Sequence, residues 1–392
     1  MYRAPTTAKQ SASEVTIHVQ SRHRSRDIPA TFPLYRFTGS HSSIGEQFGQ
    51  ACADRIHHHL ELAQNRLEQK QGIARRTAQA NAGKFRDYVL QYAPFFDEEI
   101  RGLAKGAKIT LEEAYLLQLR AELGVVPAEK LKDEPGDECT SYAVLAEATS
   151  DGIAMVGQNA DLPGFYGELG VVVEMEFDDM PSILMLTPAG QVSYLGINDR
   201  GMGAFANYLT CDGWRVGFPR YFLSRLALTQ ESVGDAIAAI RGTYRASSRN
   251  LMLMDARTAV DLETTATSDA EIHPERGMIA HANHYDHPDL LAEERAPAAY
   301  LPNTRIRGQT IRRLLDQHHG ELNSDIMQTI LRDRSTFPGC LCRVDADNPS
   351  HDSMTFASII AQPGEGRMWI AVGPPHEHEY KQYSFSHVAA TV

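Results

Sequence analysis

Apolar residues recur roughly every three to four positions through the first third of the chain, which is the spacing of an amphipathic helix. Ser43–Glu46 and Thr110–Glu113 both have the spacing of a capping box, in which a Ser or Thr and a Glu three residues later close the first helical turn. We therefore expect a largely helical N-terminal segment, preceded by a short strand at 34–37. The expected helices cover residues 43–69, 85–96, 100–103 and 110–123.

The pattern changes after Cys139, where short apolar runs alternate with turn residues. Such regular spacing predicts antiparallel meanders, with a few amphipathic helices between them. The expected strands are 171–177, 183–187, 192–196, 203–208, 251–254, 259–262, 277–281, 355–361 and 367–372. The expected helices are 219–228, 233–241, 305–318 and 324–331. A further short strand is predicted at 14–19.

One predicted hairpin brings a thiol and a carboxylate together. Cys139 opens the apolar run that ends at Leu145, and Asp161 closes the next run. Asp151-Gly152 between the two runs is a strong turn signal. A strand out and a strand back would place Cys139 and Asp161 at one edge of a sheet.

The segment before Cys139 has the composition of an exposed, cleavable connector. Residues 125–138 contain two prolines, a glycine and many charges. Cleavage of the Glu138–Cys139 bond would make Cys139 an N-terminal residue, whose α-amine can take the proton from its own thiol. An α-amine with a pKa near neutrality suits that role. The alternative interpretation of Cys139 is a buried structural cysteine.

Composition and charge narrow the classes of function. The 392 residues are 42% hydrophobic and 22% charged, as in a soluble globular protein, and the net charge of −12 argues against nucleic acid or an anionic membrane as partner. No apolar run is long enough to span a bilayer, and residues 1–30 lack the apolar core of a secretion signal. Five irregularly spaced cysteines predict a reducing, cytoplasmic compartment without a disulfide framework.

Two histidine clusters could be metal ligands or ordinary polar side chains. The spacing of His281, His284 and His287 superficially resembles a metal site. The run before them predicts a strand, on which His281 and His284 would face opposite sides, so we expect no metal. His57-His58-His59 lies on a predicted helix, where adjacent side chains point in different directions, and we expect it to be solvated.

An ordered set of short motifs carries a family resemblance. The motifs are Gly39-Ser40, Ile44-Gly45 and Phe48-Gly49; Leu119–Leu123; Cys139-Thr140-Ser141; Gly157–Asp161; Leu195–Asn198; Asn207; Gly217-Phe218-Pro219; Asn250; Glu263; His281–His284; and Cys342-Arg343. Each motif is weak alone. Together, from about Gly39 to Val372, they resemble the acyl-CoA:6-aminopenicillanic acid acyltransferase (isopenicillin N acyltransferase) family of N-terminal-nucleophile cysteine hydrolases.

The resemblance implies roles for five catalytic residues. Cys139 corresponds to the nucleophile and self-cleavage point of the family, and Asp161 to the carboxylate that orients the new α-amine. Asn207 and Asn283 correspond to the asparagines near the oxyanion and the amine. Arg343 corresponds to an arginine that lines the site.

Other residues around these positions are expected to bind the substrate, and two of the residues in this region depart from the family pattern. Tyr142, Ala160 and His284 are expected to contact the substrate. Ala160 stands where the family's Gln-Asn-Trp-Asp motif has tryptophan, which implies a reshaped acyl pocket. Glu138 stands where the penicillin enzyme has glycine before the nucleophile, which implies a different backbone geometry at the scissile bond.

The resemblance implies an α+β fold, a four-layer αββα sandwich of two antiparallel sheets with helices outside. Cleavage would divide the chain into residues 1–138, which stay docked, and a catalytic core of residues 139–392. The implied activity is hydrolysis of a linear amide bond in an N-acyl small molecule through a thioester, with no cofactor. Transfer of the acyl group to an amine uses the same residues and stays open. A metal-dependent hydrolase, a non-catalytic binding protein of this fold and a homo-oligomer also stay open.

Overall fold

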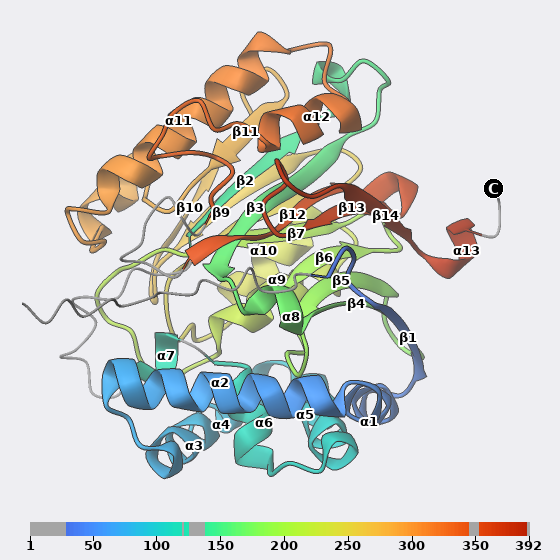
Figure 1. Cartoon of the computed structure of the whole chain (residues 1–392), viewed down its shortest axis with the longest axis vertical. Coiled ribbons are helices and arrows are strands. Elements are labelled where there is room, and N and C mark those ends of the chain that lie inside the picture. The colour runs from blue at the N-terminus through green and yellow to red at the C-terminus, as the bar shows by residue number, and fades with distance from the viewer. Residues whose placement is uncertain (1–28, 120, 125–137, 345–352, 390–392) are drawn as a thin grey trace, which may run out of the picture.

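Two β-sheets lie face to face, with helices on both outer faces (Figure 1). The computed structural model describes residues 29–119, 121–124, 138–344 and 353–389. Helices α9 (Arg220–Leu228) and α10 (Val233–Arg241) cover one sheet, and α11 (Leu301–Gln317) and α12 (Ser324–Leu331) cover the other. This arrangement confirms the expected α+β four-layer sandwich.

The two sheets are almost entirely antiparallel, as the meander pattern predicted. The eight-stranded sheet has the order β1 (Leu34–Gly39), β4 (Gly170–Phe177), β5 (Ile183–Pro188), β6 (Leu195–Asn198), β7 (Gly203–Asn207), β8 (Arg249–Met254), β9 (Ala259–Thr264) and β10 (Asp269–Ile272). The six-stranded sheet has the order β11 (Met278–His281), β2 (Glu138–Val144), β3 (Met155–Pro163), β12 (Ser353–Gln362), β13 (Arg367–Val372) and β14 (Tyr380–Ser384). The exception is β1, which pairs with β4 in parallel.

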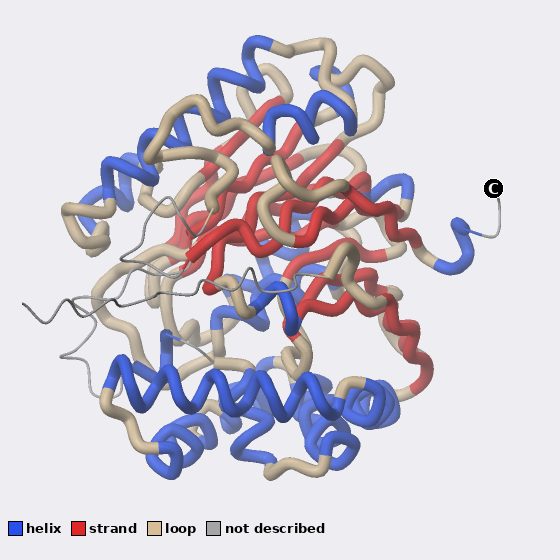
Figure 2. The backbone as a smooth tube through the Cα atoms, in the orientation of Figure 1, coloured by secondary structure: helices blue, strands red, loops and turns tan. Residues whose placement is uncertain are grey.

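The N-terminal helices gather at one end of the molecule, below the sheets in Figure 2. They are α1 (His41–Ala51), α2 (Ala53–Gln71), α3 (Arg75–Gly83), α4 (Arg86–Tyr92), α5 (Pro94–Ala107), α6 (Leu111–Leu117) and α7 (Ala121–Gly124). Two short helices, α8 (Tyr166–Leu169) and α13 (Ser386–Ala389), complete the fold. Thr110 and Glu113 form the predicted capping box at the start of α6.

Helices α1 and α5 pack unusually closely because glycines face each other across their contact. A Cβ atom on Gly45 would lie 2.1 Å from the backbone oxygen of Glu99. A Cβ atom on Gly102 would lie 2.2 Å from the backbone oxygen of Ser42. The glycines of the Ile44-Gly45 and Phe48-Gly49 motifs therefore have a packing role, since any larger residue would push the two helices apart.

Several sequence-based expectations were wrong in detail. The single helix expected over 43–69 is two helices, because the backbone leaves the helical conformation at Cys52, and Ser40 rather than Ser43 caps the first. His59 is buried with Nδ1 2.8 Å from the oxygen of Ala189, so the histidine run is not wholly solvated. The run expected at 192–196 forms a strand only from Leu195. Helix α3 and strands β10 and β14 were not anticipated.

Two of the three apolar clusters in the described part of the chain stabilise the layers. The larger core fills the space between the sheets and continues into the N-terminal helices. The smaller core lies between the six-stranded sheet and α11 and α12, and contains Tyr142, Ile311 and Ile360. None of the helices in the described ranges combines the length and the apolar character needed to cross a membrane. The strand expected at 14–19 and the connector at 125–137 lie outside the described residues.

Candidate active site

Cys139 and Asp161 lie at the same end of the β2–β3 hairpin, as the sequence predicted. Cys139 pairs directly with Ala160, and Glu138 pairs with Asp161. Because successive side chains of a strand alternate between faces, the Asp161 carboxylate lies on the other face of the sheet from the thiol. The two strands are joined by residues 145–154, which include a 3-10 turn at Ala146–Ala148, so the connection is longer than the Asp-Gly signal suggested.

The main chain of Cys139 is held on both sides by polar side chains. Its backbone N–H donates to Oδ1 of Asn283 over 2.7 Å. Its backbone oxygen accepts a 2.6 Å hydrogen bond from Nη1 of Arg307, and Nη2 of Arg307 donates to the same Asn283 oxygen over 2.9 Å. Cys139 itself is 3% exposed. These three bonds fix the position of the residue proposed as nucleophile.

Sequence reasoning missed Arg307. It lies in the middle of α11, is fully buried, and also donates to Oγ1 of Thr140 over 2.9 Å. A fully buried arginine needs partners, but an arginine within a predicted surface helix gives no local sign of burial. Only the docking of α11 on the six-stranded sheet brings its guanidinium to Cys139.

Asn283 is itself held in place, just after the end of β11. Its backbone N–H donates to Oγ1 of Thr304 over 2.6 Å. Its side-chain Nδ2 donates to the oxygen of Tyr208 over 3.0 Å. The amide therefore presents its oxygen to the backbone N–H of Cys139.

Asp161 is completely buried at the far end of the hairpin. Oδ1 accepts a 2.6 Å hydrogen bond from Oγ1 of Thr355, and Oδ2 has no hydrogen-bond partner among the described residues. Burial raises the pKa of the Asp161 carboxyl to about 7, against the opposing effects of the Arg307 charge and the Thr355 hydroxyl. The Arg307 guanidinium, which binds the main chain of Cys139, thus also favours the charged form of Asp161.

Arg343 is buried and reaches Asp161 through Thr355. Its backbone N–H donates to Oγ1 of Thr355 over 3.0 Å, and its backbone oxygen accepts from the Thr355 N–H over 3.1 Å. Thr355 in turn donates to Asp161. The structure thus links the main chain of Arg343 to the Asp161 carboxylate through Thr355.

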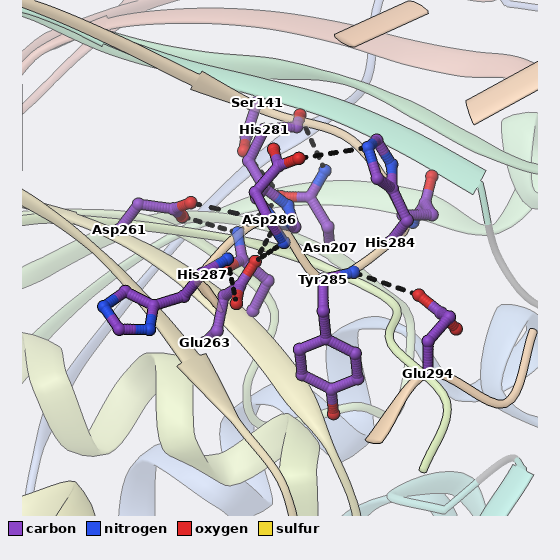
Figure 3. A network of polar contacts seen from close by, with 12 residues as sticks. Ser141, Asn207, Asp261, Glu263, His281, His284, Tyr285, Asp286, His287 and Glu294 are labelled. Atoms are coloured by element: carbon purple, nitrogen blue, oxygen red, sulfur yellow. Dashed lines mark hydrogen bonds and ion pairs between the residues drawn. The ribbon is translucent and has the colours of Figure 1, made fainter. Parts of the chain in front are cut away.

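Asn207 connects the two sheets through Ser141 (Figure 3). From β7, its Oδ1 accepts hydrogen bonds from Oγ of Ser141 over 2.5 Å and from Nδ2 of Asn250 over 3.1 Å. Its Nδ2 makes a long contact of 3.4 Å to the oxygen of His281. Ser141 follows Cys139 by two positions in β2 and so shares its face.

The three predicted substrate-binding residues occupy different surroundings. Ala160 is paired with Cys139, so its side chain lies beside the thiol. Tyr142 instead belongs to the core under α11 and α12, on the opposite face of β2, so the structure does not place it with the thiol. His284 contacts Oγ1 of Thr304 over 3.0 Å and Oδ1 of Asp286 over 3.2 Å.

The histidine cluster forms a buried network with carboxylates (Figure 3). Nε2 of His281 lies 2.8 Å from Oε1 of Glu263 and 3.9 Å from Oδ2 of Asp261. Burial disfavours the imidazolium, but the Asp261 and Glu263 carboxylates raise the pKa of His281 to about 9. His281 and His284 do not face opposite sides: their rings stack with centroids 6.2 Å apart, because His284 lies beyond the end of β11. Among the residues described, no three His, Cys, Asp or Glu side chains are placed to hold a metal ion.

Comparison with known proteins identifies the family. Residues 148–377 match the model of the acyl-coenzyme A:6-aminopenicillanic acid acyl-transferase family, and the chain belongs to this family of enzymes. Asp161, Asn207, Asn283 and Arg343 lie within the matched range, and Cys139 lies just before it. The chain is 26% identical over 345 residues to the 40 kDa form of acyl-coenzyme A:6-aminopenicillanic-acid-acyltransferase of Emericella nidulans, covering 86% of this chain and 92% of the relative.

Two types of solved structure resemble the chain more distantly. A variant of conjugated bile acid hydrolase from Clostridium perfringens has 13% identity and a TM-score of 0.44, with 63% of this chain and 97% of that chain covered. Penicillin V acylase from Agrobacterium tumefaciens has 13% identity and a TM-score of 0.37, with 60% of this chain and 83% of that chain covered.

Proposed function

We propose that the protein is an autoprocessed N-terminal-cysteine amidohydrolase that cleaves a linear amide bond of an N-acyl small molecule. The observation that carries this proposal is the pair of contacts on the main chain of Cys139. Its nitrogen is bound by Asn283 and its carbonyl oxygen by Arg307. A cysteine with a merely structural role does not require two buried side chains to form hydrogen bonds with its backbone.

Cleavage of the Glu138–Cys139 bond converts the nitrogen bound by Asn283 into an α-amine. Asn283, fixed by Thr304 and Arg307, would hold that amine in the same position. The amine then lies beside the thiol of its own residue and takes its proton. The Asp161 carboxylate, near Arg307, supplies negative charge that favours the resulting α-ammonium.

The reaction then follows in balanced steps. The Cys139 thiolate attacks the amide carbonyl carbon, and the carbonyl oxygen becomes an oxyanion. Collapse breaks the C–N bond, the amine leaves with the proton of the α-ammonium, and a thioester remains on Cys139. Water attacks the thioester carbon and gives up one proton to the α-amine. The C–S bond then breaks, the acid is released, and the α-ammonium returns its proton to the departing thiolate of Cys139.

The oxyanion requires hydrogen-bond donors at the thiol. Asn207 is suited to this role, because the contact of its Nδ2 with the backbone oxygen of His281 is long, at 3.4 Å, and its position next to Ser141 is fixed from both sheets. Asn283 could supply a second donor if its Nδ2 left the oxygen of Tyr208. One such donor is typically worth about 3–4 kcal/mol of transition-state stabilisation.

Residues 1–138 would remain bound after cleavage. Glu99 of α5 forms a buried ion pair with Arg225 of α9, and Glu122 lies 3.6 Å from Nε of buried Arg220. Gln118 also donates to the backbone oxygen of Gly190 over 2.7 Å. Breaking a buried pair by removing one partner is strongly destabilising, so the N-terminal helices behave as a docked subunit of the catalytic core 139–392.

Acyl transfer is the second candidate function, and the family match favours it. It uses the same thioester, with an amine instead of water as the acceptor. The two activities are separated by the product formed when an acyl donor is supplied with and without an amine.

Intact mass spectrometry under denaturing conditions tests the proposal. We expect two fragments, with the larger one starting at Cys139, and a mass increase of that fragment by one acyl group after brief exposure to a substrate from a panel of N-acyl amides. A single uncut chain that is fully active would overturn the proposal.

A further inference from the structure

One face of the eight-stranded sheet carries a row of polar side chains opposite Ser141 (Figure 3). Asn207 of β7, Asn250 of β8 and Glu263 of β9 are direct partners in the strand register. Asp261 precedes Glu263 by two positions in β9 and therefore shares its face. All four side chains are completely buried. Of these four, the proposed reaction uses only Asn207.

The amide of Asn250 is oriented by a carboxylate. Its Nδ2 donates to Oδ1 of Asp261 over 2.6 Å and to Oδ1 of Asn207 over 3.1 Å. An ionised carboxylate can only accept hydrogen bonds, so the atom of Asn250 that faces Asp261 must be nitrogen. The oxygen of the same amide has no hydrogen-bond partner among the described residues. The two bonds donated by Nδ2 therefore decide how this amide lies.

Asp261 is kept ionised by a neighbouring cation. Nε2 of His281 lies 3.9 Å from Oδ2 of Asp261. Burial raises the pKa of the Asp261 carboxyl to about 7, and the His281 charge opposes this rise. Burial disfavours the His281 cation, but the Asp261 and Glu263 carboxylates raise the pKa of His281 to about 9. Between these two values the pair carries both charges, and Asp261 only accepts hydrogen bonds.

The orientation of Asn250 in turn fixes that of Asn207. Because Nδ2 of Asn250 only donates, the atom of Asn207 that faces it must be oxygen. The same oxygen accepts the 2.5 Å hydrogen bond from Oγ of Ser141. Nδ2 of Asn207 is thus directed to the side of the His281 backbone oxygen, with which its contact is long, at 3.4 Å. This nitrogen is the donor assigned above to the oxyanion.

We propose that Asp261 and Asn250 are positioning residues, which orient the Asn207 amide so that its N–H group serves the oxyanion. The inference rests on the proposed function, in which Asn207 is that donor. Asp261 acts through Asn250, and its negative charge sets the direction of both amides. A neutral side chain of the same shape would not impose that direction.

Asp261→Asn tests this inference, because it keeps the shape of the side chain and removes the charge. The His281 cation attracts the oxygen of the amide introduced at position 261, so the nitrogen of that amide faces Asn250 and the amides of Asn250 and Asn207 both reverse. At a pH of about 8, between the two pKa values, we expect kcat to fall about a hundredfold with KM unchanged, as for the loss of one oxyanion donor. Asp97→Asn changes a similarly buried carboxylate of α5 and should keep kcat. An unchanged kcat in Asp261→Asn would overturn the proposal.

A double-variant cycle separates positioning from a general loss of stability. Asn250→Ala alone should lower kcat, and the further change Asp261→Asn should lower it no more, since Asp261 acts through Asn250. Melting temperatures show that each variant is folded. Two losses that add in full would overturn the proposal, because they would indicate two independent effects.

Side-chain amide NMR gives a measurement that needs no turnover. In protein labelled with 15N-asparagine, the amide signals that disappear in Asn207→Ala belong to Asn207. We expect strong nuclear Overhauser contacts between these amide protons and the β protons of Ser141 only in Asp261→Asn, because only there does the nitrogen face Ser141. The same contacts in the wild type and in Asp261→Asn would overturn the proposed orientation. A wild-type protein without amidase activity would instead contradict the proposed function, and the NMR comparison would still decide how Asn207 is oriented.

Discussion

The backbone N–H of Cys139 is bonded to the side-chain oxygen of Asn283, a residue 144 positions further along the chain. Arg307 donates to the same oxygen and also to the carbonyl of Cys139. The nitrogen that would become the α-amine is thus positioned by contacts between β2, the end of β11 and α11. The first predictions concern these contacts.

Replacing the thiol should abolish both self-cleavage and turnover. Cys139→Ala should remain folded as a single chain, whereas Cys139→Ser should process slowly and hydrolyse poorly, because an alkoxide forms much less readily than a thiolate. Mass spectrometry and an amide hydrolysis assay measure the two effects. Cys211→Ala, which removes another buried cysteine, is the control and should stay active. Full activity in Cys139→Ala would move the site elsewhere.

We expect Arg307 to support self-cleavage and turnover through its simultaneous hydrogen bonds to Cys139 and Asn283, and not through its charge alone. Arg307→Lys keeps the charge but cannot bind Cys139 and Asn283 at the same time, so the rates of self-cleavage and turnover should both fall by about a hundredfold. Arg305→Lys changes an exposed arginine of the same helix and should have no effect. Equal rates in both variants would show that the contacts to Cys139 are not used.

Asn283 offers a way to separate an acceptor role from a donor role. Asn283→Asp keeps an oxygen acceptor for Cys139 and Arg307 but loses the Nδ2 donor. Asn283→Leu removes the acceptor as well, so the backbone N–H of Cys139 and Nη2 of Arg307 both lose their partner. We expect Leu to block self-cleavage and to lower the free energy of unfolding by about 1–3 kcal/mol. Asp should allow some cleavage but reduce kcat. Urea unfolding and rate measurements on the two variants distinguish these outcomes, and identical behaviour would contradict the division of roles.

Asp161→Asn should lower turnover by orders of magnitude, because Asn keeps the shape of the side chain but not the charge that favours the α-ammonium. If the carboxylate only shaped the turn that follows it, Asn would serve equally well. The measurement is kcat, with the melting temperature recorded to show that the fold persists.

The same residue predicts a pH dependence of stability. Because burial raises the pKa of Asp161 in the folded protein to about 7, the folded state keeps a proton that the unfolded state loses near pH 4. Stability should therefore fall as pH rises from about 4 to 7, by up to about 4 kcal/mol. Asp161→Asn removes this loss, so its free energy of unfolding relative to wild type should increase over that window. A constant difference between pH 4 and pH 8 would contradict the prediction.

The packing of α1 on α5 predicts an unequal effect of two glycine substitutions. Gly45→Ala would place a Cβ 2.1 Å from the oxygen of Glu99, so we expect a loss of about 1–3 kcal/mol in the free energy of unfolding. Gly83 has no atom within 4 Å of such a Cβ, and Gly83→Ala should be neutral or stabilising by up to about 1 kcal/mol. Thermal unfolding of the two variants is the measurement.

The sequence by itself determined the features that depend on neighbours along the chain. Alternation of apolar residues and the turn between them predicted the hairpin that carries Cys139 and Asp161 at one end. The capping box at Thr110 was also predicted, because its two hydrogen bonds join residues three positions apart. The family resemblance added Asn207, Asn283 and Arg343, which no local pattern had indicated.

Only the tertiary structure decided which side chains meet. Arg307 reaches Cys139 across 168 positions of sequence, and Tyr142 turns out to face a core beneath α11 rather than the thiol. His59 is buried against the backbone of Ala189, although its neighbours in the sequence suggested a solvated helix face. Local propensity acts over a few residues, whereas burial and hydrogen bonding of these side chains depend on how helices and sheets dock, which no pattern within a single element contains.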